Sequence, residues 1–200
     1  MADPVVANIL KSGAIGWYAP KGEALPDETA IAAGADWGGS WLRIGFTKEP
    51  LKLMIEDEFH EKEVEEFLMA VARRRIGRKM KMETVLSELI ADYMQLAVDG
   101  VVTTTAAGAS QKGYEDLQAG NDSEMDEYTF GFEGIRYNAS GVALPIRMGF
   151  RICTFQLNGD LEFSNRSDDY TGVPLAINAL QPVDGTTPFW FQRVTAPATS

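Results

Sequence analysis

Hydrophobic and polar residues alternate along much of this chain, and a period of two residues predicts β-strands that bury one face. The clearest case begins at Leu51. The apolar face of this segment comprises Leu51, Leu53, Ile55 and Phe59, and the polar face comprises Lys52, Glu56, Glu58 and His60. Asp57 interrupts the apolar face, so we expect a bulge or the end of the strand near this residue.

Further strands are expected where the same alternation recurs, or where aromatic and β-branched residues stand between turn residues. These segments are residues 12–20, 41–47, 78–86, 128–132, 142–152, 173–179 and 188–194. In the run from 142 to 152, Arg147 and Arg151 occupy the polar face. Asn158-Gly159 follows Leu157, and because these residues tolerate positive φ, we expect a two-residue β-hairpin turn there.

One segment changes from the strand period to the helix period. Between Leu86 and Ala97 the apolar residues recur at helical spacing, and Asp99-Gly100 supplies a C-terminal stop. We therefore expect one helix, at about residues 86–98. Residues 21–40 and 101–127 lack clear periodicity, and we expect both to be long loops that order only on assembly.

These elements predict a mainly β fold with one flanking α-helix and long inter-strand loops. The one-sided alternation and the turn residues favour an antiparallel β-sandwich or partly open barrel of about eight short strands. A parallel sheet would need fully apolar strands and intervening helices. The 200 residues, 45% of them hydrophobic, suffice for one core, so residues 1–200 are expected to form a single domain. An N-terminal arm at 1–12 and a C-terminal tail at about 195–200 are expected to flank it.

The formal net charge of −11 makes the chain a poor candidate for holding nucleic acid, because phosphate contacts need lysine and arginine. A single cysteine, Cys153, excludes an internal disulfide and fits a reducing compartment. No apolar run approaches the length of a membrane helix, so we expect no membrane contact.

Two blocks of opposite charge stand close together in the sequence. Seven of the twelve residues from Ile55 to Glu66 are acidic, and six of the nine from Arg73 to Lys81 are basic. The basic block has no interleaved aromatic residues and lies in an acidic chain, so counter-charge is a better interpretation than nucleic-acid binding. The counter-charge can act within one chain or between subunits. We interpret the two blocks as docking faces of a protein that meets copies of itself.

Enzyme chemistry finds little support in the sequence. His60 is the one histidine, and on a strand only Glu56 and Glu58 share its face, so we interpret the acidic run as solvated, with a metal centre as the alternative. Cys153 lies among apolar strand residues, where a free cysteine behaves as a buried hydrophobe rather than a nucleophile. The nucleophile-elbow and phosphate-loop glycine spacings are both absent from the sequence. We therefore expect neither enzyme activity nor a cofactor.

Three stretches together resemble the phage major tail proteins, also called tail tube proteins. YAPKGEALPDETA (Tyr18 to Ala30), followed by WLRIGFT (Trp41 to Thr47), resembles the "AP-x-G-T-x-L-P … W-x-x-L-G-x-T" opening of that family. MKMETVLSELIADYMQLAV (Met80 to Val98) is similar to its strand-into-helix passage, and Tyr170 to Asp184 is similar to its closing strand. Glu23 departs from the pattern, because threonine is common in the family at that position.

The resemblance implies a β-sandwich subunit that forms hexameric rings, which stack into the tube through which the phage genome leaves the capsid. The implied location is the virion tail, with the host cytoplasm during assembly. The implied partners are further copies of the chain, a tape-measure protein, a tail terminator and tail-tip proteins. The genomic DNA would pass through the channel without specific binding.

Opposite charge on the two faces of a ring would make stacking directional. We therefore take the following as candidate subunit-interface residues: Glu56, Glu58, Glu61, Glu63, Arg73, Arg74, Arg75, Arg78 and Lys79. Glu56, Glu58 and Glu63 are also candidate channel-lining residues, because an anionic wall lets DNA slide. Three alternatives stay open: a tail terminator, the tube of a contractile tail, and a small acidic β-barrel that binds a ligand or acts as an enzyme.

Overall fold

The computed structural model describes residues 15–62, 72–120, 124–138, 140–161 and 172–196. Over these residues the fold is mainly β and antiparallel, with one helix, and its main sheet is not closed into a barrel. The strands are β1 (Ile15–Pro20), β2 (Leu42–Arg43), β3 (Lys52–Lys62), β4 (Ala72–Leu86), β5 (Gly100–Thr105), β6 (Tyr114–Ala119), β7 (Tyr128–Tyr137), β8 (Ala143–Leu157), β9 (Val173–Ala179) and β10 (Phe189–Arg193), and the helix is α1 (Ala91–Val98). The predicted mainly β, antiparallel fold class with one helix is confirmed.

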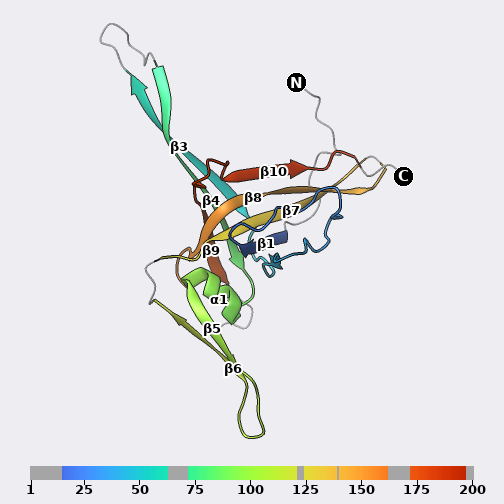
Figure 1. Ribbon diagram of the computed structural model, residues 1–200, viewed down its shortest axis with the longest axis vertical. Helices are drawn as coiled ribbons and strands as arrows, with labels where there is room; N and C mark the ends of the chain where they lie inside the picture. The colour runs from blue at the N-terminus through green and yellow to red at the C-terminus, as the bar shows by residue number, and fades with distance from the viewer. Residues whose placement is uncertain (1–14, 63–71, 121–123, 139, 162–171, 197–200) are drawn as a thin grey trace.

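The long strand β8 organises the main sheet, whose order is β2-β1-β7-β8-β9-β4-β3. One edge of β8 pairs with β7. Two further strands pair with different parts of β8. Residues 146–150 pair with β10, and residues 153–157 pair with β9. The sheet therefore continues from β8 into β9, β4 and β3, and the last two strands extend far beyond the body (Figure 1).

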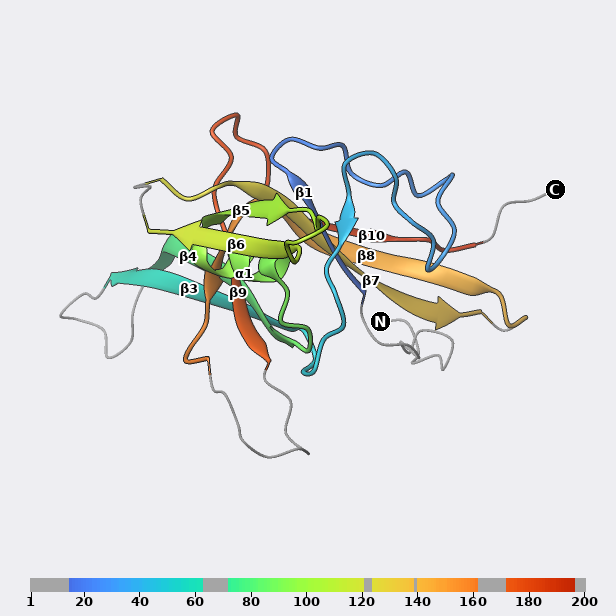
Figure 2. The same cartoon turned by 90° about the horizontal axis from the view of Figure 1, so that it is seen from below.

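Each face of the sheet carries its own hydrophobic cluster. On one face the core includes Phe130, Phe150 and Phe155, and Leu96 and Ala97 of α1 pack into it. The β5–β6 hairpin lies over the outer side of this helix (Figure 2). The burial of these side chains on both elements holds the helix against the sheet.

The opposite face carries a cluster of tryptophans. This cluster consists of Trp17, Trp37, Trp41, Trp190 and Ala19. The rings of Trp17 and Trp37 stack with centroids 5.5 Å apart. Gly131 pairs with Gly149 beneath the cluster. A Cβ on Gly131 would come within 2.7 Å of Trp190 and 2.8 Å of Trp37, so glycine makes room for both rings.

The helix is shorter than its periodicity predicts. It begins at Ala91 rather than near residue 86, because β4 continues to Leu86, which is buried and pairs with Val173 of β9. The pairing of β4 with β9 overrides the local helical pattern at this end. The predicted stop is confirmed, and Asp99 itself adopts the left-handed conformation, with a φ of 53°.

The prediction of a long loop at 101–127 is wrong. Residues 100–105 and 114–119 form the β5–β6 hairpin. The β-branched run from Val101 to Thr105 favours a strand, but both faces of the hairpin are largely exposed, so the segment lacks the apolar alternation of a buried strand.

Two other strand predictions also needed correction. The predicted two-residue turn at Asn158-Gly159 is wrong, because Leu157 pairs with Leu175 rather than with Asp160. The strand predicted at 41–47 is reduced to Leu42–Arg43, followed by an isolated bridge at Thr47. The described residues contain ten strands, compared with about eight expected from the alternation.

Residues 21–40 contain neither helix nor strand, as predicted. This loop nevertheless packs against its own subunit. Trp37 is buried, and the backbone N–H of Gly34 donates to the Glu133 carboxylate. The loop therefore has contacts within its own subunit, whereas we expected it to order only on assembly. The predicted N-terminal arm at 1–12 and residues 197–200 of the predicted tail lie outside the described residues.

Candidate subunit interface

The β3–β4 hairpin projects from the body as a two-stranded ribbon (Figure 1). Its register runs from the Lys52–Glu83 pair to the Lys62–Ala72 pair. On the other side of β4, strand β9 pairs only with residues 81–86. We use the term arm for residues 55–61 of β3 and 72–80 of β4, where each strand has only the other as a strand partner among the described residues.

The two strands of the arm carry opposite charge. From residue 55 to 61 the acidic side chains sum to −4, and from residue 72 to 80 the basic side chains sum to +5. The acidic residues of β3 are Glu56, Asp57, Glu58 and Glu61, and the basic residues of β4 are Arg73, Arg74, Arg75, Arg78 and Lys79. The two charged blocks of the sequence are thus partners within one hairpin.

One face of the arm holds ion pairs between its two strands. Arg78 donates to both carboxylate oxygens of Asp57, at 2.6 and 2.8 Å, and Arg75 lies 3.7 Å from the same carboxylate. Arg73 lies 3.2 Å from Glu61, and its guanidinium stands over the Phe59 ring. The hydrogen bonds from Arg78 lower the pKa of Asp57, and they outweigh the opposing effect of burial.

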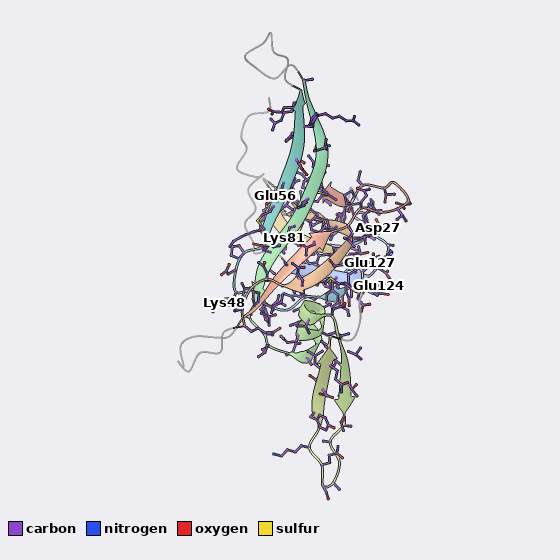
Figure 3. The ribbon with its side chains drawn as sticks, turned by 90° about the vertical axis from the view of Figure 1, so that its left-hand side faces the viewer. Asp27, Lys48, Glu56, Lys81, Glu124 and Glu127 are labelled. Atoms are coloured by element: carbon purple, nitrogen blue, oxygen red, sulfur yellow. The ribbon has the colours of Figure 1, made fainter. Side chains whose placement is uncertain are left out.

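The opposite face of the arm carries charges that form no ion pair among the residues the structure describes. It comprises Glu56, Glu58, His60, Arg74 and Lys79. Glu56 stands opposite Lys79 in the register, and His60 stands opposite Arg74. Glu56 and Lys81 both lie where the arm leaves the body (Figure 3). The predicted sharing of one strand face by Glu56, Glu58 and His60 is confirmed.

The predicted irregularity near Asp57 is also confirmed. The register shifts between Glu58 and Phe59, because Glu58 pairs with Gly77 and Phe59 pairs with Arg75. Ile76 is the additional residue of this bulge and is 59% exposed. A bulge increases the local twist of a ribbon and re-aims its side chains.

Eight of the nine interface candidates from the sequence lie on the arm, on two adjacent strands. The ninth, Glu63, which is also a channel-lining candidate, lies outside the described residues. Within the subunit Arg73 pairs with Glu61 and Arg78 pairs with Asp57, so counter-charge within one chain is present. The pairing of these blocks between subunits stays a prediction.

A recess of about 280 Å³ lies at the foot of the arm, beside β9. Its lining combines methionine side chains with charged ones, and it includes Met54, Glu56, Lys79, Lys81 and Asn178. The Lys81 ammonium donates to the Asn158 side chain at 3.1 Å. The recess therefore belongs to the same charged surface as the arm.

The β5–β6 hairpin is a second projection, and sequence reasoning missed it. It lies at the end of the long axis opposite the arm (Figure 1). Its exposed residues include Lys112, Tyr114, Glu115 and Asp116. The β-branched run at 101–105 was the available signal for it.

Sequence reasoning also missed the buried charges beneath residues 21–40. We expected Arg147 on a polar strand face, but the loop covers this face, and Arg147 is fully buried. Its guanidinium donates to Glu133 at 2.6 Å, to Glu28 at 2.9 Å and to the carbonyl of Ile31 at 3.0 Å. This network joins the loop at residues 21–40 to the sheet.

The remaining chemical candidates of the sequence offer no catalytic geometry in the described part of the chain. No three metal-ligating side chains gather there, around His60 or elsewhere. Cys153 is buried, as predicted, and burial raises the pKa of its thiol. No helix among the described residues is long and apolar enough to cross a membrane.

Comparison of the chain with protein-family models and with curated proteins yields no match. The arm, its charges and the sequence resemblance are therefore the features that bear on function.

Proposed function

We propose that this chain is a structural subunit that assembles with copies of itself into rings, and that these rings stack into the tube of a phage tail. The observation that carries the proposal is the arm, a long charged ribbon whose outer edges are unpaired in the described subunit. Exposed strand edges invite pairing with another chain. A ring assembly is one way of using such edges specifically.

The electrostatic character of the chain supports the same proposal. A channel subunit must not hold the DNA that passes it, and a net charge of −11 disfavours contact with phosphates. The resemblance of residues 18–47, 80–98 and 170–184 to tail tube proteins supports the tube over other ring-forming assemblies. In this proposal the protein resides in the virion tail and meets a tape-measure protein, a terminator and tail-tip proteins.

The test is electron microscopy of the concentrated protein, together with light scattering after size-exclusion chromatography at several concentrations. We expect stacked rings or tubes whose abundance rises with concentration. Single rings without stacking would favour the tail-terminator alternative. A monomer at every concentration would contradict the proposal and favour a small ligand-binding protein or enzyme.

A variant without the arm provides the matched control. Ile55 and Met80 are direct partners in the register, so Asn-Gly in place of residues 56–79 would close a two-residue hairpin between them. The hydrophobic clusters lie outside the deleted segment, and the near-ultraviolet circular dichroism of the tryptophans reports their integrity. We expect this variant to fold and to remain monomeric.

A further inference from the structure

We propose that the arms of neighbouring subunits join edge to edge, with the acidic strand β3 of one copy beside the basic strand β4 of the next. This inference rests on the ring assembly proposed above and specifies its contact. The occupant of each free edge is thus a second copy of this chain, held by opposite charge and by backbone hydrogen bonds.

The first support is the geometry of the arm edges. β3 is the terminal strand of the main sheet, and β4 has no second strand partner before Lys81 among the residues described. In an antiparallel ribbon, alternate backbone N–H and C=O groups point away from the partner strand. Both outer edges of the arm can therefore accept a strand from another copy.

The second support is the distribution of charge. The β3 edge carries −4 between residues 55 and 61, and the β4 edge carries +5 between residues 72 and 80. When arms lie side by side with β3 of each copy next to β4 of its neighbour, acidic and basic strands alternate throughout the resulting sheet. Cross-strand pairs of opposite charge stabilise such a sheet, and like charges directly opposite destabilise it.

The charges also select the symmetry of the contact. A two-fold dimer would place β3 against β3 or β4 against β4, and so would bring strands of like charge together. The β3-to-β4 contact is heterologous, so it repeats from copy to copy until the rotation closes a ring. If the arms run along the ring axis, they all point the same way, and β4 lies antiparallel to the neighbouring β3.

The third support is apolar surface on the arm. Ile55 is 49% exposed, Phe59 is 39% exposed and Ile76 is 59% exposed. A neighbouring arm would remove part of this surface from water. Charge and a bulge can also protect an edge against pairing. In that case the arms would not join neighbouring copies, and exchanging their charges would not change which subunits share a ring.

The test uses a charge-exchange variant that keeps every opposite pair within the arm. Its acidic strand becomes basic through Glu56→Lys, Asp57→Lys, Glu58→Lys and Glu61→Lys. Its basic strand becomes acidic through Arg73→Glu, Arg74→Glu, Arg75→Glu, Arg78→Glu and Lys79→Glu. Native and exchanged proteins are dissociated in high salt, mixed in equal amounts and returned to low salt, and native mass spectrometry then gives the composition of the rings.

We expect each protein to form rings alone. In the mixture, each ring should contain only native or only exchanged subunits, because a contact between the two proteins would place like charges opposite each other. Random mixing, or an exchange variant that folds but does not assemble, would overturn the arm contact. A preference for mixed rings would overturn it too, in favour of contacts between identical strands. If the native protein forms no rings at all, the proposed function fails together with the arm contact.

A second pair of variants covers the case in which the exchanged chain does not fold. One carries only the four lysine substitutions and the other only the five glutamate substitutions. Neither should assemble alone, and the two together should form rings of alternating composition. Assembly of either variant alone would contradict the proposal. The variant Lys112→Glu, Glu115→Lys, Asp116→Lys changes charges on the β5–β6 hairpin instead, and it should mix randomly with the native protein.

Discussion

Arg147 and Glu133 form an ion pair within the main sheet, with 2.6 Å between the guanidinium Nε and a carboxylate oxygen, and both side chains are buried. The pair stands on adjacent strands, because Glu133 of β7 is the register partner of Arg147 of β8. Glu133 also accepts a hydrogen bond from the backbone of Gly34, so the same carboxylate links the sheet to the loop at residues 21–40.

The substitution Glu133→Gln should destabilise the protein by about 3–5 kcal/mol, because it leaves the buried Arg147 guanidinium without its main counter-charge. Urea denaturation followed by circular dichroism measures the loss. Glu28→Gln is the matched control, since the Glu28 carboxylate contacts the same guanidinium from a more exposed position. We expect a smaller loss for that control. An equal or larger loss would show that Glu28 is the principal partner.

The substitution Trp37→Ala should cost about 3–5 kcal/mol, as for other buried large-to-small aromatic changes. It should also accelerate hydrogen exchange across residues 21–40, because Trp37 packs this loop against the other tryptophans. Phe46→Ala is the control at an exposed aromatic residue, with an expected change within about 0.5 kcal/mol. Unchanged exchange in the Trp37 variant would mean that other contacts hold the loop.

The pKa of Asp57 should rise toward its ordinary value in Arg78→Gln, because the hydrogen bonds from Arg78 are the main cause of its lowered pKa. A carboxylate with a lowered folded-state pKa contributes stability above its unfolded-state pKa, and this contribution disappears as the pH falls through the folded-state value. The arm should therefore loosen at acidic pH. Carboxylate chemical shifts give the titration, and Arg74→Gln, on the opposite face, should leave it unchanged.

The thiol of Cys153 should not react with a thiol reagent in the folded protein at neutral pH. Cys153 is buried, and burial raises the pKa of its thiol, so both access and the reactive thiolate are lacking. Full reaction is expected in urea. In the variant Ser40→Cys, one thiol at an exposed loop position should react at once and the second only after unfolding. Rapid reaction of the native protein would reveal local opening of β8.

The strand period could be predicted well from the sequence because it is a local property. Alternation at residues 51–59 predicted both the two faces of β3 and the bulge near Asp57. The exposed hairpin at 100–119 was missed because strands without a buried face lack this signal. The start of the helix was also misplaced, since the pairing of Leu86 with Val173 involves residues distant in the chain.

The sequence also could not assign the partner of each charge. Two opposite blocks separated by a short segment are compatible with a contact between subunits or with a hairpin, and the register of β3 and β4 shows that they are partners within one hairpin. Arg147 looked like a solvent-facing residue for the same reason, because the loop that covers its strand face comes from more than a hundred residues earlier.

The sequence by itself therefore determined the β character of this protein, the faces of its longer strands and its acidic balance, because these follow from side-chain order and composition. Only the tertiary structure decided which strands are neighbours, which charges are buried and which edges remain open. Those features depend on contacts between distant segments, and the period of a single strand contains no information about its partner.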